Sequence, residues 1–187
     1  MSIRNVINVY SRNSYILKKK AKPLERKIFS ECKEVNDLVV TAKAMACRGL
    51  AAPQIGSSLR MFAIKDDYTG LVDIVINPKI VKQSNENIVD EEACLSIPGY
   101  SFLVNRSKYI IVNFTDYYGN KHFNHTLTGM EARVFLHEYD HLDGILAPDR
   151  GPVLHVPVFG SPWEYNDDDY IIYDDDDDDF YEEEQRK

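Results

Sequence analysis

The chain has 187 residues, of which 44% are apolar, and a formal net charge of −8. This length fits one domain of ordinary size, and the apolar share is enough for a core without disulfides or oligomerisation. There is no run of 18 apolar residues, which excludes a membrane-spanning helix. No self-similarity recurs at the periods typical of repeat proteins, so a repeat architecture is not expected.

The negative charge is concentrated at the C-terminus. Residues 164–187 hold 13 acidic residues and two basic ones, a charge of −11, so residues 1–163 carry 20 bases against 17 acids, or +3. A nearly neutral domain argues against a broad phosphate-binding surface. Consecutive aspartates repel one another, so we expect residues 166–187 to form a disordered, solvated tail. Binding of a partner and folding onto the basic core are the alternatives.

The cysteines and the N-terminus bear on the compartment. Cys32, Cys47 and Cys94 are an odd number at no disulfide-framework spacing, which indicates a reducing environment. The N-terminus has no apolar signal segment, so we expect a cytoplasmic protein; an organelle or a virus-infected host cell would leave the same pattern. The basic residues before Glu25 are typical of a transit peptide, but residues 6–10 alternate as a strand, which we favour.

The predicted elements are one helix, a run of β-rich segments and then a second helix. Apolar residues at helical spacing predict a helix from about Phe29 to Ala46. The β-rich segments that follow are Met61–Lys65, Leu71–Val81, Tyr109–Thr115 and His122–Leu127. The last two flank a Gly119-Asn120 pair, which favours a hairpin turn.

A second helix is marked at both ends. Thr128 with Glu131 three residues later is a capping-box pattern, and Gly144 is a plausible C-cap. Beyond it, the proline- and glycine-rich residues 148–165 predict irregular chain.

This second helix contains His137-Glu138-Tyr139-Asp140-His141, an HExxH pattern. Histidines four residues apart share one helix face, so both imidazoles can reach one metal ion. Glu138 lies one step round the helix, where its carboxylate can take a proton from a metal-bound water. The alternative is a pair of histidines on a helix surface.

The third ligand decides the chemistry. A metzincin would have histidine where this chain has Ala147, and no second acidic helix offers the glutamate of a thermolysin-like site. Cys94 is the remaining candidate, although a single cysteine is most often a small buried hydrophobic residue. It lies in a polar stretch, whereas Cys32 and Cys47 adjoin the first predicted helix and are interpreted as packing residues.

A further segment, residues 47–56, has small residues typical of a tight turn with close backbone approach. The side-chain amide of Gln54 could donate a hydrogen bond to an oxyanion there. A turn glutamine without a catalytic role is the simpler interpretation of that residue alone.

Together these segments resemble the peptide deformylase family, metallohydrolases that remove the formyl group from the N-terminal methionine of new polypeptides. The family motifs G-x-G-L-A-A-x-Q, E-G-C-L-S and Q-H-E-x-D-H-L have counterparts, in that order, at residues 47–54, 92–96 and 136–142. The likeness extends from about Ile3 to Leu146. Cys47 and Ala93 replace family glycines, and Arg48 replaces a residue that is usually apolar.

The fold that fits is α+β, with antiparallel β-sheets packed around a central metal-binding helix that carries the HExxH pattern, and an N-terminal helix. We expect a catalytic domain at residues 1–147, the irregular segment at 148–165 and the acidic tail at 166–187.

The resemblance implies a role for each site residue. Cys94, His137 and His141 would hold the metal, with water in the fourth position. Glu138 would be the general base and then the acid, and Gln54 with the backbone N–H of Leu95 would stabilise the oxyanion. The peptide would bind as an extended strand. The expected substrate contacts are Gly49, Arg48 and Ala93, with Met130 and Arg133 at the edges of the methionine pocket.

The resemblance also implies cofactor and partners. Fe(II) is expected in the cell, with Zn(II), Ni(II) or Co(II) as substitutes. The expected partners are N-formyl-methionine nascent peptides, and the protein is expected to be a monomer. Some bacterial relatives dock on the ribosome through a basic C-terminal helix, and the acidic C-terminus here argues against that docking mode.

Two other functions compete with the deformylase interpretation. One is a zinc peptidase that uses the HExxH pattern alone, whose signature would be cleavage of unformylated peptides. The other is a catalytically idle binding protein that captures a partner with its acidic tail. The intact Glu138 and Gln54 argue against idleness.

Overall fold

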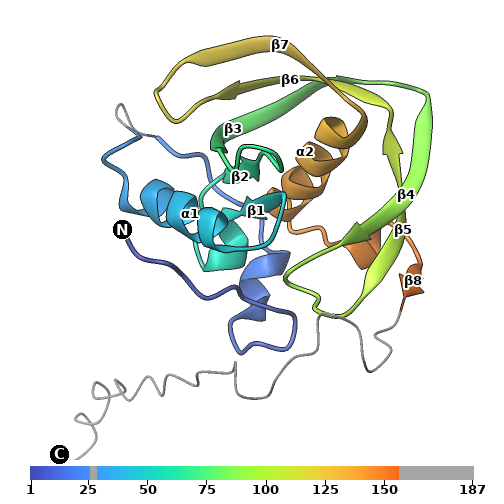
Figure 1. Ribbon diagram of the computed structural model, residues 1–187, viewed down its shortest axis with the longest axis horizontal. Helices are drawn as coiled ribbons and strands as arrows, with labels where there is room; N and C mark the ends of the chain where they lie inside the picture. Colours follow the sequence, from blue (N-terminus) through green and yellow to red (C-terminus); the bar gives the residue numbers. More distant parts are fainter. Residues whose placement is uncertain (26–28, 156–187) are drawn as a thin grey trace, which may run out of the picture. The chain divides into compact units, whose positions relative to one another are not determined.

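The computed structural model describes residues 1–25 and 29–155, which belong to one compact unit (Figure 1). The predicted acidic tail at 166–187 lies outside the described residues, as does the end of the predicted irregular segment. None of the described helices is both long and apolar enough to span a membrane.

The strands form two antiparallel sheets, which confirms the predicted α+β class. The larger sheet has the order β1-β2-β3-β6-β7, and the smaller has the order β4-β5-β8. The larger sheet consists of β1 (Gly49–Ala51), β2 (Met61–Lys65), β3 (Val72–Gln83), β6 (Tyr109–Thr115) and β7 (Lys121–Thr128). The smaller consists of β4 (Asn87–Ala93), β5 (Ser101–Ser107) and β8 (Val153–His155).

Two helices pack on opposite faces of the larger sheet, because successive side chains of a strand point to opposite faces. Along β2, Met61 and Ala63 join the core cluster beneath α1 (Lys33–Ala44), whereas Phe62 joins the cluster beneath α2 (Gly129–Leu142). The Phe62 ring meets Phe135 of α2 edge to face, with centroids 5.0 Å apart. Figure 1 shows the two helices on either side of β1 and β2.

The smaller sheet covers a third core cluster and meets the other side of α2. That cluster contains Phe102 and Val104 of β5 and Leu17 of a short 3₁₀ helix, η1 (Ser14–Lys18). Helix α2 contacts β1, β2, β6 and β7 of the larger sheet and β5 of the smaller one. It therefore lies where residues of both sheets can reach its side chains.

Several predicted boundaries differ from the observed ones. The strand predicted at residues 6–10 lies outside both sheets: residues 9 and 10 form a turn, and the Ile7 and Val9 N–H groups bond to Gln54 and Ser96, neither of which is in a strand. The first helix begins at Lys33, later than predicted, with Cys32 at its N-cap. The hairpin at Gly119 is confirmed: β6 and β7 pair across it, and Gly119 has a φ of +90°.

The ends of the second helix also differ in part. Thr128 is its N-cap, but the predicted capping box is wrong, because the Thr128 side chain makes no cap hydrogen bond. The chain enters the helix directly from β7, and Gly129 has a φ of +56°. After the helix, the chain predicted to be irregular from residue 148 continues the 3₁₀ helix η3 (Ala147–Asp149) and then forms β8.

Candidate metal centre

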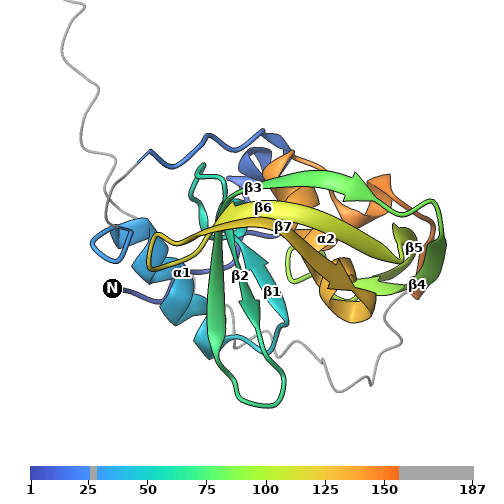
Figure 2. The same ribbon diagram turned by 90° about the horizontal axis from the view of Figure 1, so that it is seen from above.

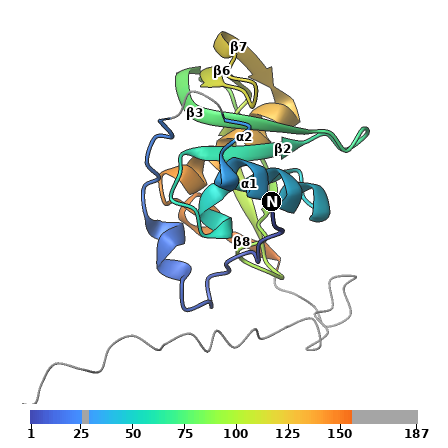
Figure 3. The same cartoon turned by 90° about the vertical axis from the view of Figure 1, so that its left-hand side faces the viewer.

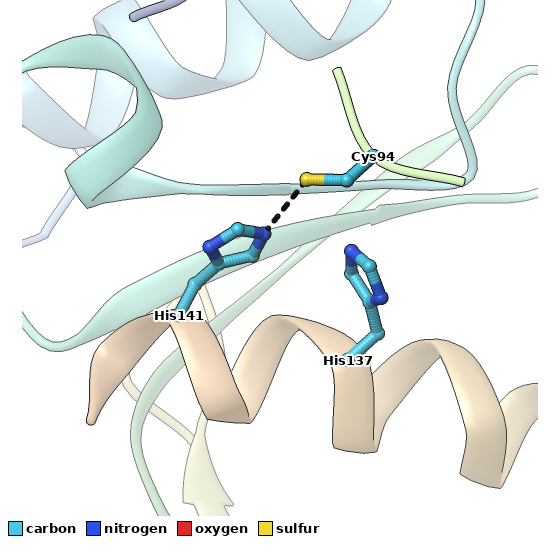
Figure 4. A group of neighbouring side chains, drawn as sticks. All are labelled: Cys94, His137 and His141. Carbon is cyan, nitrogen blue, oxygen red and sulfur yellow. Dashed lines mark hydrogen bonds between the residues drawn. The ribbon is translucent and has the colours of Figure 1, made fainter. Parts of the chain in front are cut away.

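Two elements bring the predicted metal ligands together. Helix α2 supplies His137 and His141 on one face, and Cys94 follows immediately after the last residue of β4. The three side chains point toward one another in Figure 4. The Cys94 Sγ lies 3.2 Å from the His141 Nε2. Both sheets thus contribute, since α2 packs on the larger one and Cys94 directly follows a strand of the smaller one.

The spacing of these donors fits one metal ion. One ligand atom from each of Cys94, His137 and His141 lies within 4.8 Å of the other two. Ligands of a tetrahedral ion at ordinary Zn–S and Zn–N distances lie roughly 3.4–3.6 Å apart. One thiolate and two imidazoles form a donor set that suits zinc and iron(II) alike. The residues present therefore fit a divalent transition metal.

Glu92 fixes the orientation of one ligand. Its Oε2 lies 2.9 Å from the His137 Nδ1, which leaves the Nε2 of that ring for a metal. The same carboxylate accepts two hydrogen bonds of 2.9 Å from Arg106 and one of 2.8 Å from Arg133. Burial alone would raise the pKa of Glu92, but His137 and Arg106 outweigh it and lower this pKa to about 2. The carboxylate is therefore ionised at neutral pH.

The pKa values of two cysteines near the site are shifted in opposite directions. Burial would raise the pKa of the Cys94 thiol, but His141 and His137 hold it well below its usual value. Burial, with Glu138 nearby, raises the pKa of Cys47 to about 11. Because only a thiolate ligates metal well, Cys94 has the electrostatic environment of a ligand and Cys47 does not. Cys47 has no positive φ, so its replacement of the family glycine brings no left-handed strain.

Glu138 is a buried acid beside the three ligands. Its side chain is 4% exposed, and its Oε2 has no hydrogen-bond partner among the described residues. Burial raises its pKa to about 7, against the opposing effect of His137 and His141. A carboxyl group that gains and loses a proton near neutral pH suits general acid–base chemistry.

Gln54 reaches the same site from the 3₁₀ helix η2 (Ala52–Ile55). Its Oε1 accepts a 2.8 Å hydrogen bond from the Ala51 N–H, which turns the Nε2 toward Cys94 Sγ at 3.5 Å and Ser96 Oγ at 3.2 Å. The backbone N–H of Leu95 donates to no acceptor within the described residues. Two neutral donors therefore lie close to the ligand cluster.

The sequence matches the family model for polypeptide deformylase over residues 5–155. The chain belongs to the peptide deformylase family. Its members are metallohydrolases, so this chain is an enzyme of that class, and the Cys94, His137 and His141 cluster is its candidate metal site.

Curated and solved relatives agree. The chain is 43% identical to the peptide deformylase of Dictyoglomus thermophilum over 136 residues, which cover 72% of this chain and 86% of the relative. It is 40% identical to the peptide deformylase of Pseudothermotoga lettingae over 137 residues, 73% of this chain and 78% of that one. The crystal structure of the Thermotoga maritima peptide deformylase superposes with a TM-score of 0.72 at 34% identity, covering 81% of this chain and 99% of the other.

A phage protein is also similar. The crystal structure of a probable peptide deformylase from Synechococcus phage S-SSM7 superposes with a TM-score of 0.70 at 33% identity, covering 80% of this chain and 99% of the other.

The predicted substrate-contacting residues lie in different surroundings. Gly49 lies on β1 in contact with Glu138, and Ala93 is the exposed last residue of β4. Arg48 forms a 2.6 Å ion pair with Asp67 in the β2–β3 hairpin. Figure 2 and Figure 3 show this hairpin extending beyond the rest of the larger sheet.

The two predicted pocket residues on α2 differ from each other. Met130 is 47% exposed, whereas Arg133 is 6% exposed. The Arg133 guanidinium bonds to Glu92 and to the carbonyl oxygens of Val104 and Ile88. These contacts tie Arg133 to the carboxylate that orients a ligand, and its place at the methionine pocket stays a prediction.

Sequence reasoning gave no role to Glu92, Ser96 or Arg106. Glu92 and Ser96 lie two residues before and two residues after Cys94, within the same deformylase motif. The motif alone could therefore have indicated a role for both residues. Arg106 lies in β5, outside every motif. It bonds to Glu92 and to Asp140 of α2, and only the fold reveals that link.

Proposed function

We propose that this enzyme removes the formyl group from the N-terminal formyl-methionine of newly made polypeptides and releases formate. The observation that carries the proposal is the buried Glu138 beside a cluster of one thiol and two imidazoles. Relatives named peptide deformylase have the same fold.

The proposed cofactor is one divalent metal ion held by Cys94, His137 and His141, with Fe(II) expected in the cell and Zn(II), Ni(II) or Co(II) as substitutes. Such an ion would act as a Lewis acid and would lower the pKa of a bound water toward neutrality. The lowered pKa of Cys94 and the Glu92 contact that frees the His137 Nε2 support this ligand set.

Glu138 is the proposed proton carrier. Its carboxylate takes a proton from the attacking water while the water oxygen bonds to the formyl carbon. It then gives that proton to the leaving amine nitrogen as the C–N bond breaks. Products are formate and a free amino terminus. The Glu138 pKa of about 7 supports both steps, because neither protonation state is strongly disfavoured at neutral pH.

Gln54 and Leu95 are the proposed oxyanion donors. The formyl oxygen becomes negatively charged in the transition state, and preorganised N–H groups stabilise that charge in a buried site. Two observations support the assignment: the Ala51 N–H fixes the direction of the Gln54 amide, and the Leu95 N–H is free of acceptors in the described chain.

The peptide is proposed to bind as a strand at the free edge of β1, near Ala93. Strand β1 has a neighbour on one side only. The Ala51 N–H points away from β2, toward Gln54. Alternate residues of a strand direct their backbone groups to the same edge, so those of Gly49 are available to a peptide. Arg48 adjoins this edge, and Met130 and Arg133 stay the predicted edges of the methionine pocket.

The test is formate release from a short formyl-methionine peptide by protein purified without oxygen, beside Glu138→Gln. Rapid release by the wild type and none by the variant, with equal metal content, is the expected result. A fully metallated wild type that releases no formate would refute the proposal. Cleavage of an unformylated peptide instead would indicate the peptidase alternative. The monomeric state, the cytoplasmic location and the lack of ribosome docking through a basic helix stay predictions.

A further inference from the structure

The two proposed halves of the site belong to different sheets. Gln54 follows β1 of the larger sheet, whereas Cys94 and Ser96 follow β4 of the smaller one. No strand of one sheet pairs with a strand of the other among the described residues. The distance between the Gln54 amide and the ligand cluster therefore depends on contacts other than a β-ladder.

An N-terminal segment bridges the two halves. The Ile7 N–H donates a 2.7 Å hydrogen bond to the Gln54 carbonyl, and the Val9 N–H donates a 2.9 Å bond to the Ser96 carbonyl. Val9 is the first residue of a turn that the Ser11 N–H closes with a 3.0 Å bond to the Asn8 carbonyl, which fixes the backbone at this end of the segment. The backbone of the segment thus holds the η2 segment and the loop after Cys94 at a fixed separation.

The side chains of this segment pack against two different core clusters. Val6 packs against the core cluster beneath α1. Ile7 and Val9 pack against the cluster that contains Cys94. The apolar contacts therefore attach the segment to both parts of the core and keep its two N–H donors in register.

The start of the segment is anchored to α1. The Ser2 N–H donates a 2.8 Å bond to the Asp37 carboxylate, and the Arg4 N–H donates a 3.0 Å bond to the Thr41 Oγ1. Figure 1 shows this part of the chain, in dark blue, running from α1 toward η1. Both acceptors are buried, since Asp37 is 2% exposed and Thr41 is 0% exposed.

We propose that residues 2–9 form a positioning strap that sets the Gln54 amide against the Cys94 loop and thereby maintains the turnover rate. Its N–H groups at Ile7 and Val9 hold the backbones, and the fully buried Ser96 holds the amide itself through the 3.2 Å contact with Gln54 Nε2. The strap residues touch no reacting atom. The effect on turnover rests on the proposed function, whereas the strap itself does not.

Proline and alanine substitutions at the same positions distinguish the effect of losing a backbone hydrogen bond from the effect of losing side-chain packing. Ile7→Pro and Val9→Pro each remove one N–H donor, while Ile7→Ala and Val9→Ala keep the donor and remove packing. Ile3→Pro is the matched control, because the Ile3 N–H donates to no acceptor in the described part of the chain. We expect each proline variant to have a kcat about ten-fold below that of its alanine partner. KM and metal content should stay close to wild type, and Ile3→Pro should match wild type throughout.

Two readouts keep the proposal testable without turnover. Amide hydrogen exchange in the wild type should be slow at Ile7 and Val9 and fast at Ile3. Thermal unfolding identifies any proline variant that does not fold. In that case Thr41→Val, which removes the Arg4 anchor without a proline, should accelerate exchange at Ile7 and lower kcat about two-fold.

The outcomes separate the strap from the proposed function. Folded proline variants with the kcat of their alanine partners would refute the positioning role. Exchange at Ile7 and Val9 as fast as at Ile3 would show that no strap exists. A wild type with slow exchange but no formate release would refute the proposed function and leave the strap standing as a structural element.

Discussion

The backbone of Gly49 lies against the carboxylate of Glu138, so closely that a Cβ on Gly49 would be 2.3 Å from the Glu138 Oε1. Real Cβ atoms do not approach an oxygen this closely, so Gly49→Ala must displace the carboxylate or the strand. We expect it to lower the free energy of unfolding by about 1–3 kcal/mol and to reduce formate release at least ten-fold. Urea unfolding and the peptide assay measure the two effects.

The same substitution in a Glu138→Ala background is the control. With the carboxylate absent, the added methyl group has room, so Gly49→Ala should cost much less stability there than in the wild type. This coupling measures the contact between the two residues. Equal costs in both backgrounds would mean that the methyl group collides with something else.

Metal retention should depend on Cys94 and on neither other cysteine. Cys94→Ala removes the thiolate whose pKa the two histidines lower, so we expect the purified variant to lose most of its metal by elemental analysis. Cys32→Ala removes a fully buried thiol whose pKa is raised by burial and should keep a full complement. A metal-replete Cys94→Ala protein would contradict the proposed ligand set.

Acid should destabilise the protein through Glu92. Its pKa is lowered to about 2 in the folded protein from an ordinary value of 4.5. A lowered pKa means that its stabilising effect is complete above pH 4.5 and is lost as pH falls through 4.5 toward 2. The full loss is roughly 3 kcal/mol, measurable by urea unfolding across this pH range.

Glutamine variants isolate this contribution. Glu92→Gln cannot titrate, so its unfolding free energy should depend less steeply on pH below 4.5. Glu86 is the matched control, because its side chain is 75% exposed in a surface pair with Lys108. If Glu86→Gln flattened the pH dependence as much as Glu92→Gln, the acid sensitivity would not come from the buried network.

The sequence predicts four strands of the larger sheet and misses β1, whose residues are predicted to form a tight turn, as well as all three strands of the smaller sheet. Strands β2 and β6 have the predicted bounds, because their apolar residues alternate or cluster as buried strands do. In β4 the pattern is inverted: the apolar Ile88 and Val89 are exposed, and the one buried residue is the charged Glu92. No hydrophobic periodicity can reveal a strand whose buried side chain is a carboxylate.

The candidate site also has residues that the sequence reveals and residues that only the fold brings together. The histidines follow from helix spacing and Cys94 from its motif, so local sequence is enough to bring them to attention. The partners of Glu92 are 14 and 41 residues away, at Arg106 and Arg133. Their convergence depends on how α2 packs against β5, which periodicity does not encode.

Met130 and Arg133 provide the last test, because the sequence predicts both at the methionine pocket and the structure gives them different neighbours. Arg133→Met would leave Glu92 with one donor fewer and remove the donor to the Val104 and Ile88 carbonyls. Leaving buried polar groups unpaired is costly, so we expect an unfolding free energy lower by about 3 kcal/mol. Met130 is half exposed, so Met130→Ala should change stability by less than about 0.5 kcal/mol and raise KM for formyl-methionine peptides.

Comparing the Arg133 and Met130 variants shows whether Arg133 supports the metal ligands or contacts the substrate. If Arg133 acts through Glu92, Arg133→Met should also weaken metal retention, because Glu92 orients the His137 ring. A substrate contact would instead leave metal content unchanged and raise KM selectively for methionine over norleucine or leucine at the first position. Metal titration of both variants, beside KM values for these peptides, decides between the two roles, because only loss of the buried guanidinium should alter the affinity for metal.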